Sequence, residues 1–314
     1  MPLDPRARRF LDLLAATNPP SALNLSVAER RAALGHMMGF SGPLVAVGDV
    51  KDCTLPGPAG RLPARLYTPF GYDAAPRPGL VYFHGGGLVA GSVATHDAVA
   101  RSLANAGACR VLSVDYRLAP EFRFPAAIDD AVAAVLHVCS KAGDFGMDAK
   151  RIGVCGDSAG GTLAASVCQS VARSGGPQLA LQLLLCPILD YAGTTESRRS
   201  LGQGYLVDEA TLSHDLLYYI PADTDVADPR VSPLRALDLT GLPRTAIHAA
   251  EFDPLRDEAK AYAERLAGAG TPATYSCHAG MIHLFYAMAG VIPAARTAFE
   301  QIGADIRAAF LCDN

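Results

Sequence analysis

Short apolar runs without regular polar alternation recur from the first third of the chain onward. They cover residues 79–83, 110–114, 151–155, 179–186 and 245–249. Strands lose polar alternation when both of their faces are covered, as in parallel sheets. The stretches between these runs, including residues 128–139 and 259–266, repeat apolar side chains at helical spacing. This order of strands and helices predicts an α/β fold with a doubly wound, mostly parallel sheet.

Residues 1–48 have a different, helical pattern. Ser26 and Glu29 stand at the spacing of a capping box, in which each side chain bonds the backbone amide of the other at a helix start. Pro19 and Pro20 separate this helix from an earlier one. Because an apolar helical segment needs a surface to cover, residues 1–48 are expected to form the N-terminal part of a helical cap.

Two further segments complete the expected organisation. Residues 44–55 and 61–68 predict strands joined by a turn over the proline- and glycine-rich residues 56–60. Residues 190–226 are longer than a strand crossover needs, and long insertions are commonly functional lids. They contain a polar loop at 194–200 and an apolar helix at 208–220. We expect 190–226 to be an inserted cap segment, with residues 49–189 and 227–314 forming the core.

Composition narrows the class of protein. Of the 314 residues, 50% are apolar and 18% charged, and the net charge is −4. This balance argues against a nucleic-acid partner, which would favour a basic face. The chain lacks an apolar run of about 18 residues that would predict a membrane span, and its early apolar stretch is too short for a signal peptide. With eight cysteines but no Cys-x-x-Cys pair, we expect a cytoplasmic protein with reduced thiols.

A candidate nucleophile follows the run at 151–155. Residues 156–160 read Gly-Asp-Ser-Ala-Gly, and apolar residues at helical spacing come directly after them. A serine hydroxyl needs a nearby base and must be held clear of the backbone, which a sharp strand-to-helix turn achieves. Glycines two positions before and two after the serine relieve crowding in such a turn. Ser158 is therefore the predicted nucleophile.

A second motif predicts donors for a developing negative charge. The strand at 79–83 runs into His-Gly-Gly-Gly at 84–87. Successive glycines can turn their amides toward a ligand without side-chain interference, as the oxyanion of ester cleavage requires. We assign these donors to Gly86 and Gly87, with Ala159 as a third, and expect His84 to brace the loop. A phosphate cradle is disfavoured, because no Gly-Lys-Ser/Thr follows.

Candidates for the acid and the base of a triad lie later in the chain than Ser158. The loop after the strand at 245–249 carries Asp253, which we take as the acid; Glu251 is the second choice, and Asp257 and Glu258 suit the start of the next helix. For the base, His283 lies in a loop before the last helix, whereas His278 closes an extended run. A base on a loop at the carboxyl end of the sheet can reach the serine, which favours His283.

Five motifs now agree. They lie at residues 84–87, 116–121 (Tyr-Arg-Leu-Ala-Pro-Glu), 156–160, 253–258 (Asp-Pro-Leu-Arg-Asp-Glu) and 280–283. On these motifs, roughly residues 60–310 resemble the bacterial hormone-sensitive-lipase-type (family IV) carboxylesterases of the α/β-hydrolase superfamily. The resemblance implies an α/β-hydrolase core, a cap made of the N-terminus and an inserted segment, and cleavage of short-chain esters without a metal or cofactor.

The chain departs from the family pattern beside two motifs, with Leu88 where an aromatic residue is common and Leu284 where a glycine is common. Both departures bear on the shape of the substrate pocket. The residues expected to contact the substrate are Leu88, Asp157, Met37, Met38, Phe40, Leu206, Ile282 and Leu284, with Tyr218 and Tyr219 as further candidates for the pocket wall.

Other functions make different demands. A ligand receptor on this scaffold typically lacks the histidine, and a lipase for long-chain lipid would need a membrane-active amphipathic helix, of which the sequence gives no clear sign. Amides, lactones and carbamates stay open as substrates, because the same triad serves all acyl transfers. The predicted function is hydrolysis of a small-molecule ester with a short- to medium-length acyl chain through an acyl-enzyme, and the sequence leaves a homodimer open.

Overall fold

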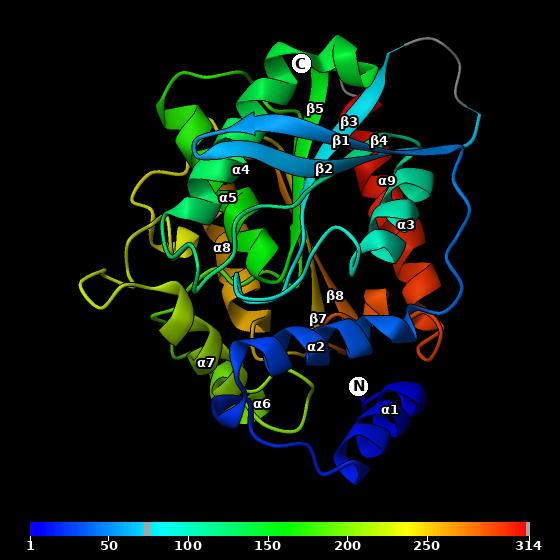
Figure 1. Ribbon diagram of the computed structural model, residues 1–314, viewed down its shortest axis with the longest axis vertical. Helices are drawn as coiled ribbons and strands as arrows, with labels where there is room; N and C mark the ends of the chain where they lie inside the picture. The colour runs from blue at the N-terminus through cyan, green and yellow to red at the C-terminus, as the bar shows by residue number, and fades with distance from the viewer. Residues whose placement is uncertain (72–75, 312–314) are drawn as a thin grey trace.

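The computed structural model describes residues 1–71 and 76–311, which build one eight-stranded sheet (Figure 1). The strands are β1 (Asp49–Gly57), β2 (Gly60–Thr68), β3 (Arg77–Phe83), β4 (Arg110–Val114), β5 (Met147–Asp157), β6 (Leu181–Leu185), β7 (Thr245–Phe252) and β8 (Ala273–Ile282). Their order is β1-β2-β4-β3-β5-β6-β7-β8. The pairs β1–β2 and β2–β4 are antiparallel, and the other pairs are parallel. The mostly parallel sheet predicted from the sequence is confirmed.

Each face of the sheet has its own hydrophobic core. Along β3, Leu80 and Tyr82 belong to one cluster and Val81 and Phe83 to the other, because successive strand residues point to opposite faces. All four side chains are fully buried, which explains the absence of polar alternation. One face is covered by α3 (Asp97–Gly107) and α9 (Ala294–Leu311), and the other by α4 (Ala126–Ser140), α5 (Ala159–Arg173) and α8 (Arg256–Gly268) (Figure 1).

The strand order reverses between β3 and β5. From β3 the chain passes to β4 on one side, and from β4 it crosses back to β5 on the other side. In open α/β sheets, the crevice at the carboxyl ends of two such strands is where ligands bind. The His-Gly-Gly-Gly motif after β3 and the Gly-Asp-Ser-Ala-Gly motif around the end of β5 therefore meet at this crevice.

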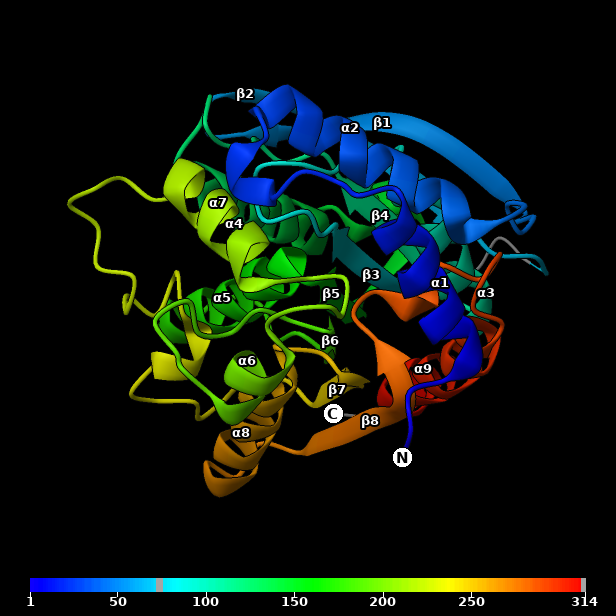
Figure 2. The same ribbon diagram turned by 90° about the horizontal axis from the view of Figure 1, so that it is seen from below.

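Two groups of helices lie beyond the carboxyl ends of the strands (Figures 1 and 2). The N-terminal group comprises α1 (Pro5–Ala16), η1 (Ala22–Asn24), α2 (Val27–Met38) and η2 (Gly39–Ser41); the inserted group comprises α6 (Glu196–Leu201) and α7 (Glu209–Tyr219). The remaining short helices are η3 (Ala142–Phe145), η4 (Pro233–Arg235) and η5 (Phe285–Ala287). Within the described ranges, no helix is long and apolar enough to cross a lipid bilayer.

The capping box at the start of α2 is confirmed. The Ser26 hydroxyl accepts from the Glu29 amide, and the Glu29 carboxylate accepts from the Ser26 amide over 2.8 Å. The prediction of a loop at 194–200 is wrong in part, because α6 occupies most of these residues. Thr195 caps this helix, and Ser197 is buried and donates to the Pro254 carbonyl over 2.7 Å. A polar sequence thus forms a helix because its polar groups find partners in the core.

The first strand begins later than predicted, at Asp49 instead of residue 44. Its pairing with β2 ends where Asp49 faces Thr68, and Pro69 follows without an N–H group that could extend the ladder. Leu44 and Val45 consequently stay exposed. The turn of this hairpin is also tighter than expected, because Gly57 already pairs with Gly60.

Candidate active site

Ser158 occupies the sharp turn between β5 and α5. Its backbone lies at φ 52° and ψ −121°, in a region that residues other than glycine rarely adopt. Two glycines let the backbone segments approach closely: a Cβ at Gly156 would collide with the Gly160 carbonyl, and a Cβ at Gly160 would collide with the Phe83 carbonyl. The Ser158 amide donates to the Leu185 carbonyl over 2.9 Å. The turn therefore holds the hydroxyl clear of its own backbone.

His283 links Ser158 to Asp253. The Nδ1 atom of His283 lies 2.7 Å from Asp253 Oδ2, and its Nε2 atom lies 3.1 Å from Ser158 Oγ. A carboxylate can only accept a hydrogen bond, so Nδ1 carries the proton and Nε2 is left to accept from the serine. The Leu255 amide donates to the other carboxylate oxygen over 2.9 Å. Asp253 and His283 are fully buried, and Ser158 is slightly exposed.

Three backbone amides lie near Ser158, because Gly86 and Gly87 line the same cavity as the serine and Ala159 follows it directly. Gly86 and Gly87 have φ of 119° and 68°, and Ala159 is the first residue of α5. In the described part of the chain, none of these three amides has a hydrogen-bond acceptor. A Cβ at Gly86 would collide with the Ala90 carbonyl, and one at Gly87 with the Asp215 carboxylate. Only glycine fits at either position, and the unused donors suit a developing oxyanion.

Asp157 holds the two motifs together. Its carboxylate accepts from the Tyr82 hydroxyl over 2.5 Å and from the Gly85 amide over 3.0 Å, and it lies 3.5 Å from His96 Nε2. Burial by itself raises the pKa of this carboxyl, but the nearby His96 and the hydrogen bond from Tyr82 bring the pKa below its ordinary value. Asp157 is thus a buried anion that joins the glycine-rich loop to β5.

His84 braces the same loop, as expected. Its Nδ1 atom lies 2.9 Å from the Gly85 carbonyl, its ring stacks on Tyr116 at 4.4 Å, and the Tyr116 hydroxyl donates to the His84 carbonyl. Burial, reinforced by the neighbouring His96, lowers the pKa of His84 to about 3. The ring is therefore neutral at neutral pH and stabilises the loop by packing and hydrogen bonding.

A cavity of about 370 Å³ opens onto Ser158 and His283. Its walls come from the core, from the N-terminal helices and from the inserted helices. Of the residues expected to contact substrate, Met37, Leu206 and Leu284 line it, together with Gly86 and Gly87.

The other residues expected to contact substrate do not line this cavity. Met38 is buried one residue past Met37, because the helix turns it toward the core, and Phe40 packs on Phe10 with ring centres 5.1 Å apart. Leu88 and Ile282 are fully buried in the two core clusters. Neither Asp157, which is fully buried, nor Tyr218 and Tyr219 is among the lining residues.

Sequence reasoning missed three charged residues that line the cavity, Arg30, Asp208 and Asp215. The sequence does mark Asp215. It follows Leu212 by three residues and precedes Tyr219 by four, so in a helix it lies on the same buried face as these two side chains. A carboxylate on an apolar helix face indicates a partner or a site.

The alternative acids and base have other partners. Glu251 binds the N-terminal amine of Met1 over 2.6 Å and the Gly280 amide over 2.7 Å. Asp257 accepts from the Ser197 amide, and His278 stacks on His248 with its Nε2 atom 3.1 Å from His248 Nδ1. Burial, together with His248, lowers the pKa of His278 to about 4.

One group of potential metal ligands occurs among the described residues. The Cys186 thiol and ligand atoms of Asp253 and His283 lie within 4.8 Å of one another. Burial raises the pKa of Cys186 well above its ordinary value, so the sulfur is a protonated thiol and a poor ligand. Asp253 and His283 are already bonded to each other.

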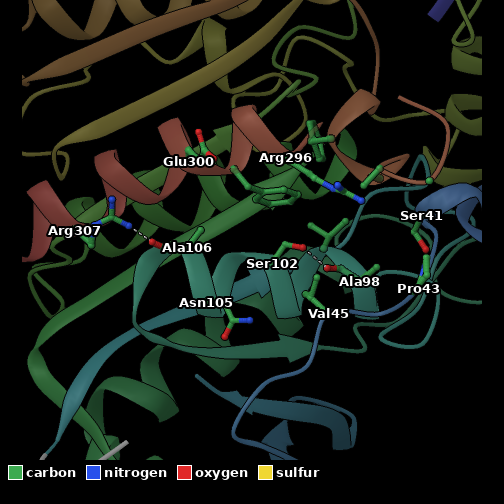
Figure 3. A pocket seen from close by; sticks show the side chains of 16 residues that line it. Ser41, Pro43, Val45, Ala98, Ser102, Asn105, Ala106, Arg296, Glu300 and Arg307 are labelled. Atoms are coloured by element: carbon green, nitrogen blue, oxygen red, sulfur yellow. Dashed lines mark hydrogen bonds between the residues drawn. The ribbon is translucent and has the colours of Figure 1, made fainter. Parts of the chain in front are cut away.

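A second cavity, of about 420 Å³, lies between α3 and α9 (Figure 3). Its lining includes the apolar residues Val99 and Phe299 and the charged residues Arg296, Glu300 and Arg307. None of the residues that line it is a histidine or a cysteine. The lining of this second cavity therefore does not repeat the serine–histidine pair of the first.

Known proteins resemble the chain in both sequence and structure. A family model described as the α/β-hydrolase fold matches residues 80–287. The carboxylic ester hydrolase LipN of Mycobacterium tuberculosis is 45% identical over 252 residues, which cover 78% of this chain and 66% of the relative. The arylesterase of Saccharolobus solfataricus is 35% identical over 287 residues, covering 91% of this chain and 92% of the relative.

Among solved structures, the ester hydrolase EH1AB1 from the metagenome of Lake Arreo, in complex with a bipyridine phosphonate derivative, is 40% identical. It superposes with a TM-score of 0.96, over 99% of this chain and all of the other. The similarity therefore extends over the N-terminal and inserted helices as well as the sheet.

The close approach at Gly160 generates a stability prediction. Gly160→Ala should lower the free energy of unfolding by at least about 2 kcal/mol, because the new Cβ must push α5 away from β3. Gly268→Ala, at an open position on α8, is the matched control and should be neutral or stabilising by up to about 1 kcal/mol. Urea unfolding of both variants measures the change in the free energy of unfolding. If Gly160→Ala unfolds at the same urea concentration as the wild type, the close approach at Gly160 is refuted.

Proposed function

The chain belongs to the hormone-sensitive-lipase-type carboxylesterases of the α/β-hydrolase fold, and we propose that it hydrolyses short- to medium-chain acyl esters through an acyl-enzyme on Ser158. The observation that supports this most is the unbroken line of hydrogen bonds from Asp253 through His283 to Ser158. Gly86 and Gly87, whose amides are free, line the same cavity as Ser158 and His283, and Ala159 follows the serine directly, which supports these roles for the three amides.

In the first half of the reaction, Ser158 Oγ attacks the ester carbonyl carbon while its proton passes to His283 Nε2. The carbonyl oxygen becomes an oxyanion and accepts hydrogen bonds from Gly86, Gly87 and Ala159. Collapse of this intermediate breaks the bond to the alcohol oxygen, which takes the proton from His283. Asp253 keeps the imidazole in the required tautomer and stabilises its charged form.

In the second half, a water molecule attacks the acyl-enzyme carbonyl and gives one proton to His283. The same amides stabilise the second oxyanion. When this intermediate collapses, Ser158 leaves as the alkoxide and recovers its proton from His283, and the acid is released. The hydroxyl and the imidazole return to their starting states, so turnover requires only the ester and water.

Residues 1–48 and 190–226 are proposed to act as a cap over a core formed by 49–189 and 227–314. Support comes from the cavity, because both segments contribute to its walls beside Ser158. Its volume of about 370 Å³ lies near the lower end of the range usual for ligand sites. This size favours acyl groups of short to medium length.

Three expectations about the whole protein stay predictions. A cytoplasmic location is supported by the seven cysteines of the described residues, none of which forms a disulfide. A homodimer is tested directly by sedimentation. The net charge of −4 continues to argue against a nucleic-acid partner.

The proposed nucleophile is tested with p-nitrophenyl esters from acetate to palmitate. The wild type should be fastest on short or middle chains, and Ser158→Ala should be slower by at least about ten-thousandfold with an unchanged melting temperature. Substantial turnover by Ser158→Ala would refute the nucleophile. A folded wild type inactive on every ester would shift the proposal to amides.

The proposed acid is tested against its nearest rival. Asp253→Asn should lower kcat by up to about ten-thousandfold, because asparagine can hold the imidazole in the wrong tautomer. Glu251→Gln is the matched control and should leave kcat nearly unchanged, since Glu251 binds Met1 and Gly280 and not the imidazole. A reversed order of the two effects would move the acid to Glu251.

A further inference from the structure

Arg30 and Asp215 form a buried ion pair between the N-terminal and inserted helices. Arg30 Nε lies 3.1 Å from Asp215 Oδ1, and Arg30 Nη2 lies 2.7 Å from Oδ2, so the contact is bidentate. The side chains are only 13% and 5% exposed. Figures 1 and 2 both place α2 beside α7, the two helices that carry the pair.

His214 adds a second connection between the same segments. Its Nδ1 atom lies 2.9 Å from Asp215 Oδ1, and its Nε2 atom lies 3.1 Å from the Leu25 carbonyl. A neutral imidazole carries one N–H, and on Nδ1 it can donate to the Asp215 carboxylate. The ring is buried, and together with Arg30 it surrounds the Asp215 carboxylate with donors.

The position of this carboxylate distinguishes it from an ordinary structural contact. Asp215 lies directly against Gly87, where a Cβ would collide with its carboxylate. Arg30, Asp215, Gly87 and Ser158 all line the same cavity. A negative charge therefore stands beside the amide that we assign to the oxyanion, in a site largely shielded from water.

A lone carboxylate at this place would oppose catalysis, because it repels the oxyanion that forms as the ester is attacked. The Arg30 guanidinium cancels that charge and is fixed to it by two hydrogen bonds. Burying an ion pair is costly, and a well-packed apolar contact could join two helices at least as well. Apolar packing could not provide charge compensation for a carboxylate in contact with the oxyanion loop.

We propose that Arg30 and Asp215 form a charge-compensated clamp, in which Asp215 joins the two helical segments over Gly87 and Arg30 keeps its charge from opposing the oxyanion. The inference rests on the proposed function. Arg30 and Asp215 are positioning residues in this account, since they act through the glycine-rich loop and the field around it. The clamp predicts that removing the charge of Arg30 lowers kcat more than removing the charge of Asp215.

The test compares kcat for p-nitrophenyl acetate among variants of the full chain. Arg30→Met leaves the carboxylate uncompensated, so kcat should fall by about ten- to a hundredfold with a smaller change in KM. The double variant Arg30→Met/Asp215→Asn removes both charges and should recover most of the lost kcat. Asp215→Asn alone should lose less kcat than Arg30→Met, because the remaining cation does not oppose the oxyanion.

Two further variants separate charge from folding. Arg30→Lys keeps the positive charge and should retain most of the wild-type kcat, even if it binds less rigidly and melts at a lower temperature. Glu121→Gln removes an exposed partner of the neighbouring Arg31 and should leave kcat unchanged, because that pair is 35% and 52% exposed and lies on the surface.

The outcomes are distinguishable. A double variant no faster than Arg30→Met, or equal losses in the two single variants, would overturn charge compensation. Wild-type kcat in Arg30→Met would overturn the clamp while leaving the esterase intact. Ser158→Ala is assayed beside them, and turnover in that variant would instead count against the proposed function.

Discussion

The backbone conformation of Ser158 is the constraint on which the site depends. A serine at φ 52° is strained, and it persists because the surrounding structure leaves it no alternative. Gly156 allows α5 to lie close to β5, Gly160 allows it to lie close to β3, and the Ser158 amide is bonded to the next strand, at Leu185. Relaxing the turn would separate the helix from the sheet and remove the hydroxyl from the imidazole.

The sheet topology brings the remaining groups to this turn. Because the strand order reverses between β3 and β5, the glycine-rich loop and the serine turn are neighbours, and Asp157 bonds one to the other through Tyr82 and Gly85. The loops after β7 and β8 deliver Asp253 and His283 to the same edge. Helices from two distant parts of the chain then cover that edge, with Arg30 and Asp215 paired between them.

Predictions from the sequence were correct where neighbouring residues determine the local structure. The buried runs predicted the parallel strands, the capping box predicted the start of α2, and the spacing of glycines around Ser158 predicted the turn. Predictions failed where a contact with a residue distant in the sequence determines the conformation. Helix α6 forms because Ser197 reaches Pro254, and Leu88 turns to the core instead of the cavity; neither contact can be read from neighbouring residues. The pairing of Arg30 with Asp215 belongs to the same class.

Rapid-quench mass spectrometry with p-nitrophenyl acetate shows whether Ser158 carries the acyl group. We expect a burst of nitrophenolate and, in the same interval, one acetyl group on the peptide that contains Ser158. The Asp253→Asn variant should form this species more slowly. A burst with the acetyl group on another residue, or steady turnover with no acylated protein at any quench time, would show that Ser158 is not the nucleophile.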